Sequence, residues 1–213
     1  MDNKDMLQAM HDEGIIAVLR SANVSQALDV ARACLAGGVR FIEITFSVPG
    51  ADEAIRALAS DAAGSAIVGA GTVIDAPQAQ SAIDAGARFV VAPVFCAEVL
   101  ECCAESNIPY IPGCMTPNEM FAATKAGCKV VKLFPAAELS PRFIKDVHAP
   151  LPNLQIMPTG GIDLDNAASW IAAGAFALGV GGNLTKMKED GLAGITARAQ
   201  AFREQVSVGR GDA

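Results

Sequence analysis

A short pattern that occurs four times along the chain constrains its fold more than any other feature. Each copy is a glycine, preceded by an alanine or another glycine, and followed by a mostly apolar run. The copies, which align without gaps, are Gly38-Val-Arg-Phe-Ile-Glu, Gly86-Ala-Arg-Phe-Val-Val, Gly127-Cys-Lys-Val-Val-Lys and Gly174-Ala-Phe-Ala-Leu-Gly. Such a glycine ends a helix, and the run after it is typical of a buried strand. The copies lie 48, 41 and 47 residues apart, about two strand–helix units each, which predicts strands two, four, six and eight of a (βα)8 TIM barrel.

The segments between these copies complete the alternation of strands and helices. We expect strands at residues 15–19, 39–45, 67–70, 89–91, 110–111, 130–133, 155–157 and 177–180. We expect helices at 4–13, from a cap at Asn23 or Ser25 to 35, and at 50–58, 76–85, 96–105, 117–126, 141–148, 165–173 and 192–206. No linker divides the chain, so we predict one domain over residues 1–213, with a short N-terminal helix and a frayed tail at 207–213.

Composition narrows the classes of function. The net charge of −7 argues against general binding of nucleic acid. Only two histidines occur, so a metal site rich in imidazole is not expected, and we predict no cofactor. The six cysteines have no Cys-x-x-Cys spacing, and neither a secretory signal nor a membrane-length apolar run is present. We therefore expect a cytoplasmic protein with reduced thiols that does not bind membranes.

One lysine interrupts an apolar strand. Lys132 lies between Val131 and Leu133, in a stretch where we expect burial. An ammonium group loses its hydration in such a place, so burial lowers the pKa of a lysine and makes its neutral amine available as a nucleophile. The alternative is a lysine at a strand end whose long side chain reaches out to water.

The register of the repeats gives this lysine a partner. The fifth residues after the four repeat glycines are Glu43, Val91, Lys132 and Gly179. Alternate strands of a barrel point side chains inward in shared layers, so these four residues are predicted to form one layer, with Glu43 opposite Lys132. An acid and an amine that share a dry cavity indicate a catalytic site, although a buried structural ion pair fits the same pattern.

Further candidate residues follow the strands on the carboxyl side. Arg20 follows the first strand and suits a carboxylate, Thr72 follows the third and can donate to an oxygen, and Pro93 follows the fourth. Two glycine turns, Pro158-Thr-Gly-Gly161 and Gly179-Val-Gly-Gly-Asn183, come after strands seven and eight. In this fold these turns form the usual phosphate site, although both can also be simple tight turns. Neither matches a nucleotide-binding fingerprint.

Several segments together resemble one enzyme family. They are Gly38-Val-Arg-Phe-Ile-Glu-Ile-Thr-Phe, Val68-Gly-Ala-Gly-Thr-Val, Ile111-Pro-Gly-Cys-Met-Thr-Pro-Asn-Glu, Val131-Lys-Leu-Phe-Pro-Ala and Met157-Pro-Thr-Gly-Gly-Ile. This set is similar to the bacterial 2-keto-3-deoxy-6-phosphogluconate (KDPG) aldolases, a group that includes the 4-hydroxy-2-oxoglutarate (KHG) aldolases. The similarity runs from about residue 15 to residue 183 in the order of the predicted barrel.

The resemblance implies a class I aldolase that works without a metal and is usually a homotrimer. It implies that Lys132 forms the Schiff base and that Glu43 is the general acid and base. The pyruvate contacts that it implies are Arg20, Thr72, Pro93 and Phe134. The phosphate contacts that it implies are Thr159, Gly160, Gly161, Gly181, Gly182 and Asn183. One position departs from the pattern: some relatives have an arginine four residues after the glutamate, where this chain has Ser47, so Arg20 is expected to take its role.

The expected reaction is cleavage of 2-dehydro-3-deoxy-6-phosphogluconate to pyruvate and glyceraldehyde 3-phosphate. This substrate is a phosphorylated keto acid, and it is expected to bind to Lys132 as an iminium before it is cleaved. The same chemistry on 4-hydroxy-2-oxoglutarate, on the galactonate-derived epimer, or on oxaloacetate as a decarboxylation stays open. A phosphosugar isomerase or epimerase would use Glu43 as a base and keep Lys132 charged. A non-catalytic protein that binds phosphometabolites is the third alternative.

Overall fold

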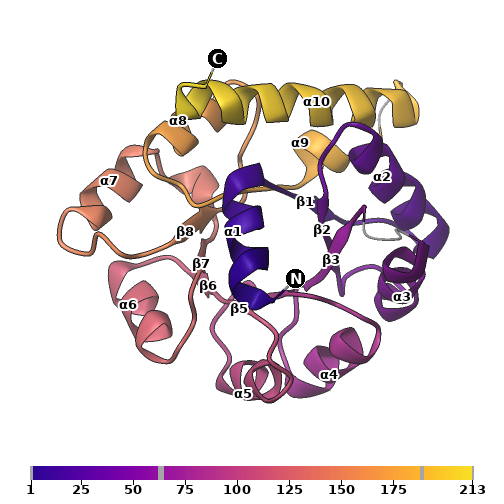
Figure 1. The fold of residues 1–213 in the computed structure, drawn as a ribbon, viewed down its shortest axis with the longest axis horizontal. Helices are drawn as coiled ribbons and strands as arrows, with labels where there is room; N and C mark the ends of the chain where they lie inside the picture. The colour runs from indigo at the N-terminus through magenta and orange to yellow at the C-terminus, as the bar shows by residue number, and fades with distance from the viewer. Residues whose placement is uncertain (1, 62–64, 188–189, 213) are drawn as a thin grey trace.

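The computed structural model describes residues 2–61, 65–187 and 190–212, in which parallel strands alternate with helices (Figure 1). The strands are β1 (Ile15–Leu19), β2 (Phe41–Thr45), β3 (Ile67–Gly71), β4 (Val90–Val91), β5 (Tyr110–Ile111), β6 (Gly113–Cys114), β7 (Val131–Leu133), β8 (Ile156–Pro158) and β9 (Leu178–Val180). The helices are α1 (Asn3–Glu13), α2 (Val24–Ala36), α3 (Ala51–Asp61), α4 (Ala76–Asp84), α5 (Ala97–Glu105), α6 (Pro117–Lys125), the 3-10 helix η1 (Ala136–Glu138), α7 (Arg142–His148), α8 (Ala167–Ala172), α9 (Gly182–Thr185) and α10 (Gly191–Arg210). Each expected strand is present: the bounds of β1 and β5 are as predicted, and those of the others differ by one or two residues.

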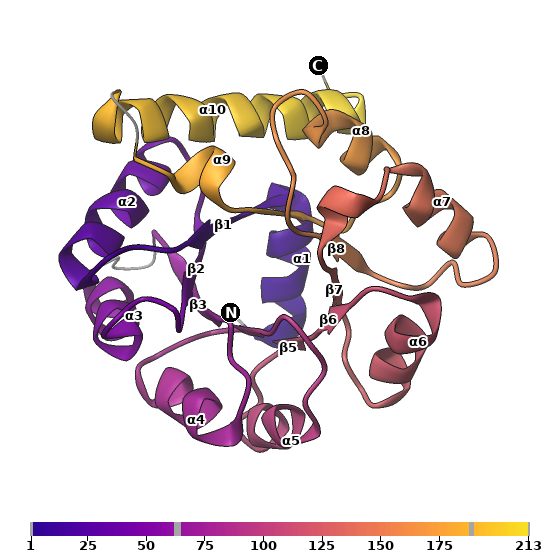
Figure 2. The ribbon, with the colours of Figure 1, turned by 180° about the vertical axis from the view of Figure 1, so that it is seen from behind.

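The strands form two parallel sheets. One has the order β5-β4-β3-β2-β1-β9, and the other has the order β6-β7-β8. β5 and β6 are consecutive in the chain and are separated by Pro112, which has no N–H to continue a ladder. At the opposite edges, an isolated bridge joins Thr159, just after β8, to Gly179 of β9. Seen from the other side, helices α2 to α8 and α10 lie around the outside of the strands, and α1 lies behind them (Figure 2).

Apolar side chains pack on both sides of the strands. Those that point outward pack against the surrounding helices, as expected for parallel strands that are covered on both faces. Those that point inward form a separate cluster, which includes Phe41, Phe89, Val91 and Val130. Met6 and Met10 of α1 join this inner cluster, because α1 lies across one end of the strands (Figure 1). The interior is therefore closed at the end where the strands begin.

Local sequence signals explain several helix ends. Asn23 caps α2 by accepting a hydrogen bond from the Gln26 N–H at 2.9 Å. Thr116 and Glu119 form a reciprocal capping box at the start of α6. The repeat glycine Gly38 has a φ of +86°, a conformation that a residue with a Cβ rarely adopts. Asn23 and Gly38 are among the positions from which the strand–helix units were predicted, whereas the capping box was not used for this.

The prediction of a frayed tail was wrong for residues 207–210, which continue α10; Ala213 lies outside the described residues. Gly209 packs so closely on α8 that a Cβ there would lie 2.5 Å from the Ala168 carbonyl oxygen. Arg210 donates to the backbone carbonyls of His11 and Asp12 at the end of α1. These contacts join distant parts of the chain, so local composition does not reveal them. No helix in the described part of the chain has an apolar stretch long enough to cross a membrane.

Candidate active site

Lys132 is a buried residue of the second sheet. It is the middle residue of β7, its side chain is only 3% exposed, and its Nζ lies 5.0 Å from the centre of the Phe134 ring. Burial is the main reason that its pKa is lowered from the usual 10.5; the Arg20 charge lowers it further and the Glu43 charge opposes the change. The neutral amine is thus favoured.

Glu43 is the middle residue of β2 and has no exposed surface. Neither of its carboxylate oxygens has a hydrogen-bond partner among the described residues. Burial raises its pKa above the usual 4.5, and the charges of Lys132 and Arg20 oppose this rise. Gly71 of β3 makes room for the carboxylate, since a Cβ there would lie 2.0 Å from Glu43 Oε1. A buried acid without partners is costly to the fold, which points to a role in chemistry.

The two groups influence each other without direct contact. Each shifts the pKa of the other, but they form no ion pair among those of the described residues. A carboxylic acid with a neutral amine holds as many protons as a carboxylate with an ammonium ion, and burial favours the uncharged arrangement. The pair therefore supplies a nucleophilic amine together with a protonated acid that can exchange its proton.

The other members of the predicted inner layer are also buried. Val91 belongs to the inner apolar cluster. Gly179 leaves space for Thr159, whose Oγ1 would lie 2.2 Å from a Cβ at position 179. This hydroxyl is fully enclosed and has no hydrogen-bond partner in the described part of the protein. Sequence reasoning grouped Thr159 with the glycine turns and did not foresee that its hydroxyl is enclosed without a hydrogen-bond partner.

The residues predicted at the strand ends lie at the carboxyl side of the same strands. Arg20 is exposed, its charge acts on both Lys132 and Glu43, and its Nη1 would lie 3.5 Å from a Cβ at Gly181. Thr72 has a φ of +58°, a strained backbone conformation for a β-branched residue that is found mainly at functional sites. Phe134 is half-buried beside the lysine. Pro93 packs against β6, where a Cβ at Gly113 would lie 2.0 Å from its carbonyl oxygen.

The two glycine turns lie side by side and present free donors. The Asn183 Nδ2 donates to the Ile162 carbonyl at 2.8 Å, which ties the second turn to the first. The backbone N–H groups of Gly161, Gly182 and Asn183 donate to no acceptor within the described residues. Gly161 has a φ of +74°, and its carbonyl accepts from Asn166, a residue that sequence reasoning missed. Free N–H groups on adjoining turns suit an anion, and Asn183 contributes its backbone while its side chain is already bonded.

The raised pKa of Glu43 predicts how stability depends on pH. Between pH 4.5 and the higher pKa in the folded protein, the unfolded chain loses this proton while the folded chain keeps it, so stability falls as pH rises. Glu43→Gln removes this loss. The test compares Lys132→Met, in which Glu43 titrates without its partner, with the double variant that also carries Glu43→Gln. Below pH 4.5 the difference in their free energies of unfolding should hardly depend on pH. Above pH 4.5 the double variant should become the more stable of the two, by about 1.4 kcal/mol for each unit by which the pKa of Glu43 is raised.

Urea unfolding of the two variants across this range measures the difference directly, because the other titrating groups are common to both proteins. A difference that stays constant or shrinks as the pH rises would show that Glu43 is not held in a desolvated site.

Comparisons with known proteins point to one family. A family model described as "Aldolase: KDPG and KHG aldolase" matches residues 6–197. The 2-dehydro-3-deoxy-phosphogluconate aldolase of Treponema pallidum is 38% identical over 168 residues, which cover 78% of this chain and 80% of the relative. The 2-dehydro-3-deoxy-6-phosphogalactonate aldolase of Escherichia coli is 31% identical over 196 residues, 90% of this chain and 96% of the relative.

A solved structure links the fold to covalent chemistry. The KDPG aldolase of Legionella pneumophila, described with pyruvate captured as a covalent carbinolamine intermediate, superimposes with a TM-score of 0.79. It is 28% identical in sequence, and the match covers 95% of this chain and 97% of that one.

Proposed function

Because this chain belongs to the KDPG and KHG aldolase family, we propose that it cleaves 2-dehydro-3-deoxy-6-phosphogluconate to pyruvate and glyceraldehyde 3-phosphate. The protein is an aldolase, and therefore a carbon–carbon lyase. The single observation that carries the mechanism is the buried pair, in which Lys132 has a lowered pKa and Glu43 has a raised one. The substrate is a phosphorylated keto acid, a class that the names of the relatives support.

We propose that the two sheets are parts of one closed (βα)8 barrel and that residues 1–213 form a single domain. The bridge from Thr159 to Gly179 and the short interruption at Pro112 support this closure. In a closed barrel the carboxyl ends of all strands share one mouth, so the pair, the strand-end residues and the glycine turns serve one substrate.

Lys132 begins the cycle as the nucleophile. Its neutral amine attacks the C2 ketone of the substrate and forms a carbinolamine, which loses water to give an iminium. The Phe134 ring, 5.0 Å from Nζ, provides a favourable surface for the cationic iminium. Arg20 and Thr72 bind the adjacent carboxylate, and Pro93 forms an apolar wall of the pyruvate site. Arg20 thus takes the place of the arginine that some relatives have at the position of Ser47.

Glu43 transfers the protons. Its acid form first passes its proton, through a water, to the carbinolamine hydroxyl, which leaves as water. The carboxylate that remains takes the proton of the C4 hydroxyl as the C3–C4 bond breaks, and the electrons of that bond move onto the iminium to form an enamine. The aldehyde product leaves with its new C4 carbonyl. Glu43 then returns the proton to C3, and water adds to the renewed iminium and releases pyruvate. The Glu43 and Lys132 side chains form no direct ion pair, so a water molecule between them can carry the first proton. The free Thr159 hydroxyl supplies a hydrogen bond to a substrate oxygen in this interior.

The two glycine turns hold the phosphate of the substrate, with donors from Gly160, Gly161, Gly181, Gly182 and the Asn183 backbone. Gly161→Ala tests this role, because its φ is +74° and a Cβ would lie 2.7 Å from the Ala137 Cβ. We expect kcat/KM to fall about tenfold or more on the phosphorylated substrate, and to change little on unphosphorylated 4-hydroxy-2-oxoglutarate.

Gly127→Ala is the matched control, since Gly127 also has a positive φ, +115°, but has open space around its Cβ position and lies at the other end of the strands. Gly127→Ala therefore measures the effect of backbone strain alone. If Gly161→Ala lowered kcat/KM equally on both substrates, or if the two variants lowered it equally, the turn that contains Gly161 would not bind the phosphate.

The C4 epimer derived from galactonate is the second candidate substrate, because a relative of that name matches more of the chain, although at lower identity. Rates of pyruvate release from the two epimers decide between them. The proposal requires a higher kcat/KM for the gluconate-derived epimer, and the reverse order would assign the protein to the other reaction.

We further propose that the protein is a homotrimer. Ile74, Val94 and Phe95 follow neighbouring strands and are exposed at 51%, 54% and 41%, which leaves an apolar surface beside the mouth. Sedimentation velocity should give the mass of a trimer, and a monomer at micromolar concentration would contradict the proposal.

A further inference from the structure

A cavity of about 880 Å³ lies at the end of the strands opposite to the glycine turns, and the proposed reaction does not use it. Its walls come from α1, from β5 and from the residues just before β7, β8 and β9, among them Tyr110, Val130, Gln155 and Phe176. Neither Lys132 nor Glu43 lines it. Its volume is within the range of small-molecule sites, about 300–1,000 Å³.

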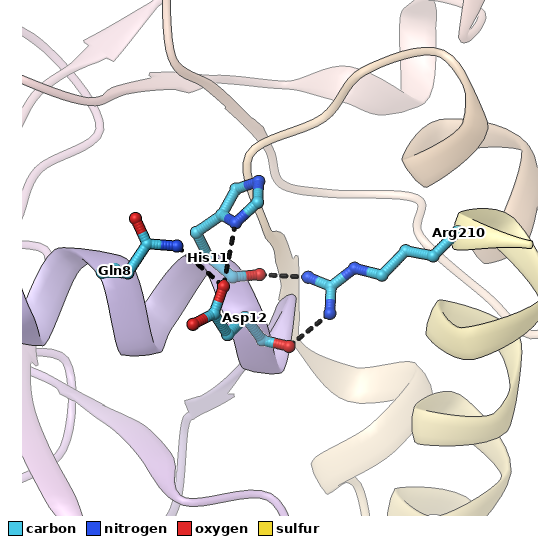
Figure 3. Close-up of polar contacts among 4 residues, drawn as sticks. All are labelled: Gln8, His11, Asp12 and Arg210. Carbon is cyan, nitrogen blue, oxygen red and sulfur yellow. Dashed lines mark hydrogen bonds and ion pairs between the residues drawn. The ribbon is translucent and has the colours of Figure 1, made fainter. Parts of the chain in front are cut away.

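The charge of the lining contrasts with that of the whole chain. The protein has 23 acidic and 16 basic residues, yet no carboxylate among the described residues lines this cavity. Lys4 and Lys129 line it, together with His11 and the amide side chains of Gln8 and Gln155. The nearby Asp12 is outside the lining and accepts hydrogen bonds from Gln8 and His11 (Figure 3). A wall with cations and amides but no acids favours an anionic ligand.

The floor of the cavity is apolar. Leu7, Ile111, Val130 and Phe176 line it and also belong to, or pack on, the cluster inside the ring of strands. Leu100 and Ala104 of α5 add apolar surface on the side. A ligand that fills this space therefore has an apolar body as well as an acidic group.

The walls are held in place by contacts within the protein. At the start of α1, the Asn3 Nδ2 donates to the Asn107 carbonyl at 2.6 Å. At its end, Arg210 of α10 donates to the carbonyls of His11 and Asp12 (Figure 3). α1 is thus fixed at both ends beside the cavity, so a ligand does not have to order it, and less of the binding free energy is lost.

We propose that this cavity is a binding site for a small organic acid with an aromatic or aliphatic body, whose acidic group is bound by Lys4 and Lys129. The site is separate from the aldolase centre and does not depend on the substrate proposed above.

Fluorescence titration with 8-anilino-1-naphthalenesulfonate, a dye with a sulfonate and an apolar aromatic body, tests the site. We expect saturable binding of one dye per chain, unaffected by excess inorganic phosphate or by prior borohydride trapping of pyruvate, which occupy the aldolase centre. The neutral analogue N-phenyl-1-naphthylamine should bind more weakly. No saturable binding, or displacement by phosphate, would overturn the proposal.

Variants locate the dye. Lys4→Glu/Lys129→Glu should weaken dye binding by about tenfold or more, since two charge-assisted contacts are lost, and should leave the neutral analogue unchanged. Lys125→Glu/Lys145→Glu is the control, with the same charge change at exposed lysines outside the lining. Ala104→Trp should block the cavity and abolish binding, while the melting temperature and the aldolase rate stay unchanged. Equal weakening in both double variants, or full binding to folded Ala104→Trp, would overturn the proposal.

Discussion

Lys132→Met is expected to lower kcat/KM for pyruvate release by at least about 10⁴-fold, the scale of loss when a covalent nucleophile is removed. Methionine has a similar length and keeps the contact with Phe134, but it has no amine to form a carbinolamine. The variant should fold, because methionine fills the space of the buried amine without a polar group to desolvate, and the raised pKa of Glu43 lets that side chain stay protonated and uncharged. A coupled assay with lactate dehydrogenase measures the rate.

Lys145→Met is the control for this experiment, since Lys145 is an exposed lysine on α7. It should retain full activity. If Lys132→Met were folded and lost less than about tenfold, the reaction would not proceed through an iminium on this residue, and the reading of Lys132 as an electrostatic partner in an isomerase or epimerase would gain support.

Glu43→Gln should lower kcat by about 10²–10⁴-fold, the usual contribution of a positioned general acid or base. Glutamine has almost the same shape and fits under Gly71, but it cannot accept the C4 hydroxyl proton or return a proton to C3. The variant should still form the iminium with pyruvate, because Lys132 keeps its buried position. In single-turnover experiments, carbon–carbon cleavage should therefore slow much more than adduct formation.

The matched comparison is Glu43→Asp, which keeps the carboxyl group but withdraws it toward β2. It should recover part of the rate that Glu43→Gln loses. A Glu43→Gln variant with a near-normal cleavage rate would show that another group transfers the protons, while failure to form any adduct would mean that Glu43 chiefly positions the lysine.

The position of the central pair was accessible from sequence because it depends on two regular features. A helix-ending glycine fixes where each strand begins, and the alternation of side chains along a strand then decides which residues point inward. Glu43 and Lys132 occupy equivalent positions after two such glycines, so their shared interior was predicted before any contact was known. The strand bounds were predicted for the same reason.

Features that depend on contacts between distant segments were not accessible in this way. Pro112 divides the fifth strand position into β5 and β6, and α10 extends to Arg210 because of contacts with α1 and α8. The sequence marked Thr72 as a candidate but not its positive φ, and it did not reveal that the Asn183 side chain is used to join the two turns. Each of these features depends on what lies beside the residue in space.

The most direct test of the account is reductive trapping. The protein is incubated with pyruvate and borohydride, digested, and analysed by mass spectrometry. We expect one reduced pyruvate unit per chain, located on the peptide that contains Lys132, present in Glu43→Gln and absent in Lys132→Met. No adduct, or an adduct on any other lysine, would contradict the claim that the buried amine of β7 carries the reaction.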